Sequence, residues 1–302
     1  MLKNNSYSII IIRISLKIYK GVGDMKKIAL SLFLLLSIFT FGADKVLMNG
    51  KVTGKKPTLK VMTYNIAAGA NNFKVDLKKT AEAIKAVNPD IIGVQEVDRL
   101  TNRSGKIDQA QVLANLTGYN LVFGKTIDFD GGEYGIAILS KHPILSHYQI
   151  ELPSSDEQRI ALIAQIEVPG FEVPITYINT HLDWHENPQV RMEQIYAIDQ
   201  HTLDLRGIKL LGGDFNDTLN SDVIKHLNRY WTPVISEKHD HRTWPAINPE
   251  VGLDYIFTNH AQKWKVSTYI PNTEKAMKKD GIEWNKTSDH IPVITTLKLI
   301  EK

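Results

Sequence analysis

Apolar and polar positions alternate along the chain with two periods, one typical of strands and one typical of helices. Short apolar runs bounded by Gly, Pro and polar clusters predict strands at 59–66, 91–97, 119–123, 135–139, 160–168, 173–179, 208–211, 253–258, 265–270 and 291–299. Apolar residues at helical spacing predict helices at 75–87, 109–116 and 188–205. Many strands with few helices predict an α/β fold in which two sheets pack face to face with helices outside. No repeat or interdomain linker interrupts this pattern, so we expect one domain over 57–302.

The first part of the chain has the pattern of an export signal. Residues 25–43 begin with Lys26 and Lys27, continue with an apolar stretch and end in small residues, which is typical of a secretory signal peptide. The apolar stretch is shorter than the roughly 20 residues of a membrane span, so a retained anchor is the less favoured alternative. Met25 is a natural start, and we interpret 1–24 as a mis-assigned upstream extension and 44–56 as a linker. The pattern predicts a periplasmic or extracellular protein without a stable membrane anchor after cleavage.

Charge and cysteine content narrow the function classes. The whole chain has a net charge of +3, but residues 1–43 hold six basic residues and one acidic residue, which leaves −2 from Asp44 onward. A protein that binds nucleic-acid phosphates over a large surface usually shows a basic excess, and this one does not. The chain contains no cysteine, which excludes disulfides, thiolate nucleophiles and Cys-ligated zinc. We expect a monomer.

Polar residues of a few types gather at strand ends. The stretch 210–217, LLGGDFND, places a carboxylate and a carboxamide directly after an apolar strand and two glycines. Five other strands also carry an acid, amide or histidine at one end: Asn65, Glu96, Asn179 with His181, Asp254, and Asp289 with His290. One such residue alone is ordinarily a turn residue or part of a local ion pair. Six together predict a ligand site where the strand ends meet.

These residue types suit the hydrolysis of a phosphoester. Carboxylate and amide oxygens are ligands for Mg²⁺ or Mn²⁺, which offsets charge on phosphoryl and leaving oxygens. A histidine, which titrates near neutral pH, moves a proton or donates to the phosphate. An aspartate holds the histidine ring in one tautomer.

The motifs that carry this chemistry resemble those of the endonuclease/exonuclease/phosphatase superfamily. They occur in order as YN at 64–65, QE at 95–96, THLD at 180–183, GDFN at 213–216, LDYIF at 253–257 and SDH at 288–290. The resemblance runs through nearly all of the mature chain. It implies a DNase I-like four-layer α/β sandwich, with two mainly antiparallel sheets flanked by helices, and a metal-dependent phosphoric ester hydrolase.

The resemblance also implies roles for single residues. Glu96 is implied to be the principal metal ligand, supported by Asn65 and Asp289. Asp214 is implied to activate or orient water, Asn216 to hold a phosphate oxygen, His290 to pair with Asp254 and contact the scissile phosphate, and His181 to contact the phosphate as well. Two weaker correspondences place Glu133 behind His181 as its support and make Arg159 a phosphate-facing arginine, for which a surface arginine is an equal alternative.

The substrate stays open at this stage. A phosphodiesterase or phosphatase acting on a small phosphoester, a secreted non-specific nuclease, a sphingomyelinase-like phospholipid phosphodiesterase and a non-catalytic anion-binding module are the alternatives. Trp184, Trp244 and Trp284 lie near motifs and either line a groove or, as we favour, pack loops and core. The KHDHR stretch at 238–242 is interpreted as a hydrated loop rather than a second metal site.

Overall fold

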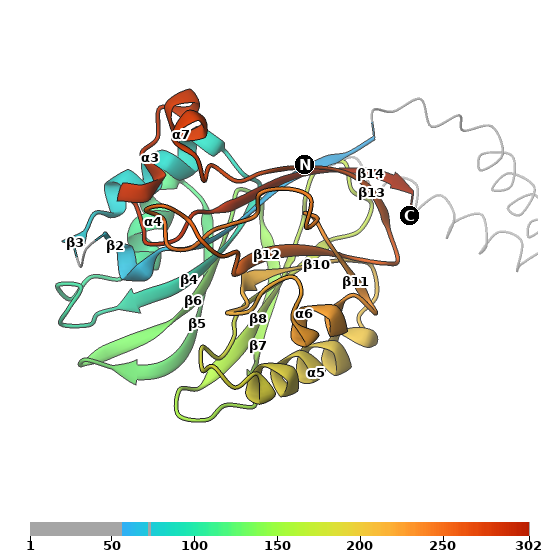
Figure 1. The fold of residues 1–302 in the computed structure, drawn as a ribbon, viewed down its shortest axis with the longest axis horizontal. Helices are drawn as coiled ribbons and strands as arrows, with labels where there is room; N and C mark the ends of the chain where they lie inside the picture. The colour runs from blue at the N-terminus through green and yellow to red at the C-terminus, as the bar shows by residue number, and fades with distance from the viewer. Residues whose placement is uncertain (1–55, 72–73, 302) are drawn as a thin grey trace, which may run out of the picture. The chain divides into compact units, whose positions relative to one another are not determined.

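Two six-stranded sheets lie face to face in the computed structural model, which describes residues 56–71 and 74–301 (Figure 1). The first sheet has the order β13 (Lys263–Tyr269), β14 (Val293–Glu301), β1 (Thr58–Asn65), β4 (Ile91–Arg99), β6 (Gly132–Ser140) and β5 (Asn120–Phe129). The second has the order β11 (Trp231–Pro233), β12 (Asp254–Asn259), β10 (Ile208–Asp214), β9 (Ile175–His181), β8 (Arg159–Ile166) and β7 (Ile144–Leu152). A short two-stranded ribbon joins β2 (Ala70–Asn71) and β3 (Lys74–Val75). The expected sandwich of two mainly antiparallel sheets is confirmed.

Each sheet has one parallel pair of strands near its centre. β1 runs parallel to β4, and β9 runs parallel to β10, whereas the other neighbouring strands of both sheets are antiparallel. Parallel strands bring their carboxyl ends to the same edge of a sheet. The register places Asn65 opposite Gln95 in the first sheet, and it places Asp214 between His181 and Asp254 in the second. Hydrogen-bonded register therefore brings the polar strand ends together.

The alternation of side chains along β8 shows how the layers are held. Ile160, Leu162 and Ile166 belong to the core between the two sheets, whereas Ala161 and Ile163 belong to the core under the helices of the second sheet. Successive side chains of a strand point to opposite faces, so a strand covered on both sides is apolar at nearly every position. This is why residues 160–164 are apolar at every position.

Helices cover the outer faces of the sandwich (Figure 1). The helices are α3 (Leu77–Val87), α4 (Gln109–Thr117), α5 (Gln189–Leu203), α6 (Asp222–Leu227) and α7 (Glu274–Asp280), with 3₁₀ turns at Ala67–Gly69 and Trp284–Lys286. α3 packs against α4, which lies beside β4, and α6 packs against α5, which lies beside β7. Among residues 56–71 and 74–301, no helix has both the length and the apolar character of a membrane span.

Several elements had no counterpart in the sequence pattern, among them β7, α6 and α7. β7 alternates polar and apolar residues and is exposed along most of its length, because it is an edge strand of the second sheet. α6 and α7 span only six and seven residues, too few for a helical period to stand out. The predictions for 1–24 and 25–43, and nearly all of the predicted linker 44–56, lie outside the described residues.

Candidate active site

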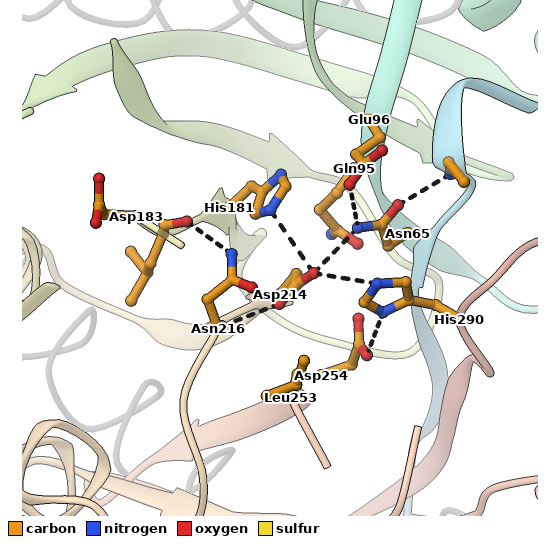
Figure 2. Close-up of polar contacts among 12 residues, drawn as sticks. Asn65, Gln95, Glu96, His181, Asp183, Asp214, Asn216, Leu253, Asp254 and His290 are labelled. Carbon is orange, nitrogen blue, oxygen red and sulfur yellow. Dashed lines mark hydrogen bonds and ion pairs between the residues drawn. The ribbon is translucent and has the colours of Figure 1, made fainter. Parts of the chain in front are cut away.

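Asp214 is the centre of the polar network at the strand ends (Figure 2). Its Oδ2 accepts a hydrogen bond from Asn65 Nδ2 at 3.0 Å and lies 3.6 Å from His181 Nε2 and 3.7 Å from His290 Nε2. The two glycines before Asp214 are needed for close approach to β9. A Cβ on Gly213 would lie 2.1 Å from the Thr180 carbonyl oxygen, which is too close for any side chain.

Glu96 reaches the site through an irregularity in β4. The pairing of β4 with β6 shifts register between Val94 and Val97, and Glu96 has a left-handed backbone with a φ of 55°. In a regular strand Gln95 and Glu96 would simply alternate between faces, but here Gln95 lies fully buried and Glu96 Oε1 accepts from Asn65 Nδ2 at 3.0 Å. A left-handed non-glycine residue costs roughly 1–3 kcal/mol, and such residues are enriched at active sites.

His290 and Asp254 form a buried pair on one side of Asp214. His290 Nδ1 lies 2.9 Å from Asp254 Oδ2, and both side chains are almost fully buried. Ser288 supports the turn before β14, because its hydroxyl donates to the Asn65 carbonyl and accepts from the His290 backbone NH. His290 is therefore held with its Nε2 toward Asp214, as the predicted pairing with Asp254 requires (Figure 2).

Burial and neighbouring charges separate the proton affinities of the two histidines. Burial by itself lowers the pKa of His290, but Asp254, Asp214 and Asp289 together raise it to about 10, so this ring is protonated at neutral pH. His181 has only the burial effect and the repulsion of Arg159 and His290, which lower its pKa well below its usual value. One histidine is thus a cation and the other is neutral.

The carboxylates are also shifted. Burial and then the charge of Asp254 raise the pKa of Asp214 to about 7. Burial raises the pKa of Glu96 as well, against the hydrogen bond from Asn65. Two buried acids with raised pKa values beside a single cationic histidine make a site that favours an added positive charge.

Asn216 adopts a left-handed backbone with a φ of 49°, which asparagine tolerates. Its backbone NH donates to Asp214 Oδ1 at 2.9 Å, and its side-chain Nδ2 donates to the Leu182 carbonyl at 3.0 Å. Asp214 and Asn216 therefore lie side by side at the end of β10, linked to the strand end that carries His181 (Figure 2).

Some of the polar side chains at the site suit a hard divalent cation, and others do not. Glu96 offers a carboxylate in an oxygen-rich, acid-rich setting, and Asp289 is an exposed carboxylate whose charge acts on both Glu96 and His290. Asn65 presents Nδ2 to the two carboxylates while its Oδ1 accepts from the Ala67 NH at 2.9 Å, so it bridges acids here rather than offering its oxygen. The buried group of Asp214, Asp254 and His290 also brings ligand-type atoms together, but a protonated His290 is no metal ligand.

Two predicted residues need separate treatment. Glu133 does not contact His181, and that prediction is wrong. Its carboxylate forms ion pairs with Arg99 and, at 3.8 Å, Lys125, because the pairing of β4 with β6 places Arg99 opposite Glu133. His181 Nδ1 is buried without a hydrogen-bond partner among the described residues. Arg159, in contrast, is buried and near enough for its charge to act on both His181 and Glu96.

Several site residues were not assigned roles from sequence. Asn179 accepts from Gln95 Nε2 at 2.6 Å and donates to the carbonyls of Val94 and Ala137, so it joins the second sheet to the first beneath the site. Glu157 pairs with Arg159 at 3.2 Å. The sequence pointed to Asn179, because it is one of the polar residues at the strand ends. It did not point to Glu157, which lies in a loop that matches no motif.

The three tryptophans near the motifs differ in exposure. Trp284 is fully buried and packs edge-on against Tyr64, as expected for a core residue. Trp184 and Trp244 are exposed, so neither is a core residue, although Trp184 stacks on the His185 ring of its own loop. The loop 238–242 is largely exposed and contains an Arg242–Asp240 ion pair, in agreement with the hydrated-loop interpretation.

Comparison with known proteins places the chain in a family. The profile of the Endonuclease/Exonuclease/phosphatase family matches residues 62–290. The uncharacterized protein YbhP of Escherichia coli is 25% identical over 258 residues, which cover 80% of this chain and 97% of YbhP.

Solved structures agree on the fold. An endonuclease/exonuclease/phosphatase from Bacteroides vulgatus superposes with a TM-score of 0.66 at 20% identity, covering 81% of this chain and all of that one. A mannosyl-6-phosphatase from Bacteroides thetaiotaomicron superposes with a TM-score of 0.59 at 18% identity, covering 80% and 99%. The family match, over most of the chain and through every motif of the site, shows that this protein belongs to the endonuclease/exonuclease/phosphatase family, whose members are phosphoester hydrolases.

Proposed function

We propose that this protein is an exported phosphoester hydrolase that uses Mg²⁺ or Mn²⁺ to assist attack of water on phosphorus. The observation that carries the proposal is the position of Asp214, whose Oδ2 lies within 3.7 Å of both His181 Nε2 and His290 Nε2 and within hydrogen-bond distance of Asn65. One carboxylate with two histidines of opposite protonation state suits a reaction in which a proton leaves water while charge gathers on a phosphate.

The protonation states of Asp214, His290 and His181 give them different roles in the reaction. Asp214, ionised above about pH 7, accepts a hydrogen bond from the attacking water and orients it. His290, protonated below about pH 10 and held by Asp254, donates to a phosphoryl oxygen. His181 stays neutral and offers a second hydrogen bond to the phosphate from the opposite side of Asp214.

Glu96 and Asp289 would hold the divalent cation, which offsets negative charge on phosphoryl and leaving oxygens when it is bound. Asn65 donates to both Glu96 and Asp214, and it keeps these two carboxylates together when no cation is bound. Export is supported by the signal-like sequence at 25–43, which lies outside the described residues.

The test is turnover of p-nitrophenyl phosphate and bis-p-nitrophenyl phosphate by purified protein, with Mg²⁺, with Mn²⁺ and with EDTA. We expect metal-dependent release of p-nitrophenol from at least one substrate and loss of about 10²–10³-fold in Asp214→Asn. DNA, RNA and sphingomyelin added to the panel separate a nuclease or a lipid phosphodiesterase from an enzyme for small phosphoesters. Absence of turnover on every substrate, with anion binding retained in Asp214→Asn, would favour the non-catalytic binding module.

A further inference from the structure

Two loops meet beside His181 and form a fixed rim. One loop, residues 153–158, connects β7 to β8, and the other, residues 182–188, follows His181 and leads into α5. Ser155 Oγ donates to Asp183 Oδ2 at 3.3 Å, and Asp156 Oδ2 lies 3.7 Å from His185 Nε2. The second loop is further held by Arg191, which donates to the Asp183 and His185 carbonyls and pairs with Asp217.

Glu157 in the first loop and Arg159, which directly follows that loop, each have a buried polar atom without a hydrogen-bond partner in the described part of the chain. Arg159 is 3% exposed, and while its Nη2 pairs with Glu157 Oε2 at 3.2 Å, its Nε has no hydrogen-bond partner among the described residues. Glu157 Oε1 is likewise buried and unpartnered within that part of the chain. Buried polar groups are ordinarily hydrogen-bonded, so Arg159 Nε favours a ligand with an acceptor and Glu157 Oε1 favours a ligand with a donor.

An exposed indole lies on the same rim. Trp184 is 59% exposed, although most residues of its type bury their rings. One face stacks on the His185 imidazole, with ring centroids 4.3 Å apart and an angle of 22°, and His185 Nδ1 is held 3.0 Å from the buried Asp183 carboxylate. The ring is therefore fixed by its neighbours and presents apolar surface to solvent.

The charges of the rim restrict what binds there. The two loops contribute four carboxylates, those of Asp156, Glu157, Asp183 and Glu186, and the guanidinium of Arg159 lies beside them and pairs with Glu157. Carboxylates at this position repel the next phosphate of a nucleic-acid strand, but they accept hydrogen bonds from hydroxyl groups. The indole of Trp184 suits a group with apolar C–H faces. The carboxylates and Arg159, which pairs with Glu157, suit an uncharged group that is rich in hydroxyls.

We infer that this rim is the subsite for a sugar or polyol carried on the scissile phosphate, so that the substrate class is a sugar or polyol phosphoester. The inference rests on the proposed function, because it names the group attached to the phosphate that Asp214 and the histidines handle. Glu157 Oε1 accepts from a hydroxyl, Arg159 Nε donates to a hydroxyl oxygen, and Trp184 contacts the C–H face of the ring. These residues determine specificity and take no part in the bond-breaking step.

The experiment compares substrates that differ only in hydroxyl groups. Glucose 6-phosphate is paired with (tetrahydropyran-2-yl)methyl phosphate, and glycerol 3-phosphate with n-propyl phosphate, each also as the methyl diester, with p-nitrophenyl phosphate as the general substrate. Glu157→Gln and Trp184→Ala are compared with Glu151→Gln and Tyr196→Ala, which remove an exposed carboxylate from β7 and an exposed ring from α5. kcat/KM is measured with saturating Mn²⁺, and calorimetry measures binding of glucose 6-phosphate.

We expect the polyol member of at least one pair to be preferred by about tenfold or more, since a hydrogen bond to a charged group contributes about 1.5–3 kcal/mol. Glu157→Gln and Trp184→Ala should reduce this preference about tenfold, and the two control variants should retain it. Turnover of p-nitrophenyl phosphate without any polyol preference overturns the subsite and leaves the proposed function standing. Absence of all turnover, with glucose 6-phosphate binding that is weakened in Glu157→Gln, overturns the proposed function and supports the subsite; absence of both turnover and binding overturns both.

Discussion

The side-chain Nδ2 of Asn65 lies 3.0 Å from Asp214 Oδ2 and 3.0 Å from Glu96 Oε1, so one amide from β1 joins carboxylates that belong to different sheets. The two carboxylates would otherwise repel each other in a buried setting. Because the amide bridges the sandwich, the geometry of the site depends on how the sheets pack as well as on the strands themselves.

Replacement of Asn65 tests this bridge. We expect Asn65→Ala to lower kcat/KM on p-nitrophenyl phosphate or its diester by about 10²–10³-fold, since the acids lose a preorganised donor. Asn120→Ala removes an asparagine at the start of β5 that bonds only backbone carbonyls, and it should retain activity. Equal rates for the two variants would contradict the role given to Asn65.

The pH dependence of the reaction follows from the shifted groups. Asp214 has a pKa raised to about 7, so its carboxylate form is gained as the pH rises through that value, and His290 loses its proton only above about 10. We expect kcat/KM to rise to a plateau above about pH 7 and to fall above about pH 10. Saturating metal should move the acid limb to lower pH, because a nearby cation favours the carboxylate.

Asp254 sets the upper limb of that profile. Its charge and hydrogen bond are the largest effects that raise the pKa of His290 against burial. Asp254→Asn should therefore move the basic limb down by at least about one pH unit and lower the plateau by about 10²–10⁴-fold. An unchanged limb would show that another group titrates there.

Glu96 links metal binding to stability. A ligand that binds only the folded protein stabilises it by about 2.7 kcal/mol at one hundred times its Kd, which corresponds to an increase in Tm of about 5–10 °C for a domain of this size. We expect Mn²⁺ to produce such an increase in the wild type and little in Glu96→Gln. The variant without metal should remain folded, because the substitution removes a buried charge and keeps the shape of the side chain. A full Mn²⁺ effect in Glu96→Gln would remove Glu96 as the principal ligand.

A carboxyl group far from the site predicts a separate pH effect on folding. Burial raises the pKa of Asp199 to about 6 even though Trp231 Nε1 donates to it at 2.9 Å. The unfolded value is lower, about 3.9, so the contribution of Asp199 to stability is fully present below about pH 4 and is lost as the pH rises through 6.

Asp199→Asn should therefore be more stable than the wild type in urea at pH 8, with the difference shrinking toward pH 5. Asp128→Asn, on an exposed hairpin, serves as the control and should show no such trend. A constant difference across this range would contradict the assigned titration.

The sequence indicated most of the site because its residues lie at regular strand ends. Asn65, His181, Asp214 and Asp254 follow or begin apolar runs, and hydrogen-bonded register then brings them together. Glu133 was misplaced because its position depends on which residue of β4 lies opposite, and Arg99 there supplies a closer partner than His181. Register between strands that are distant in sequence is not contained in a local pattern.

The rim could not be predicted for a different reason. Glu157 and His185 belong to loops whose meeting depends on the packing of β8 beside β9, and neither loop has a hydrophobic period. The register shift that turns Glu96 into the site is also a local irregularity that the apolar pattern of β4 does not indicate.

The most direct test is hydrolysis in water enriched in ¹⁸O, with the position of the label read by mass spectrometry. Attack of water on phosphorus at the Asp214 site predicts one ¹⁸O in the released phosphate product, label incorporation that depends on the metal, and incorporation that is about 10²–10³-fold slower in Asp214→Asn. Label in the released alcohol, or phosphate release at the wild-type rate in EDTA and in Asp214→Asn, would contradict it.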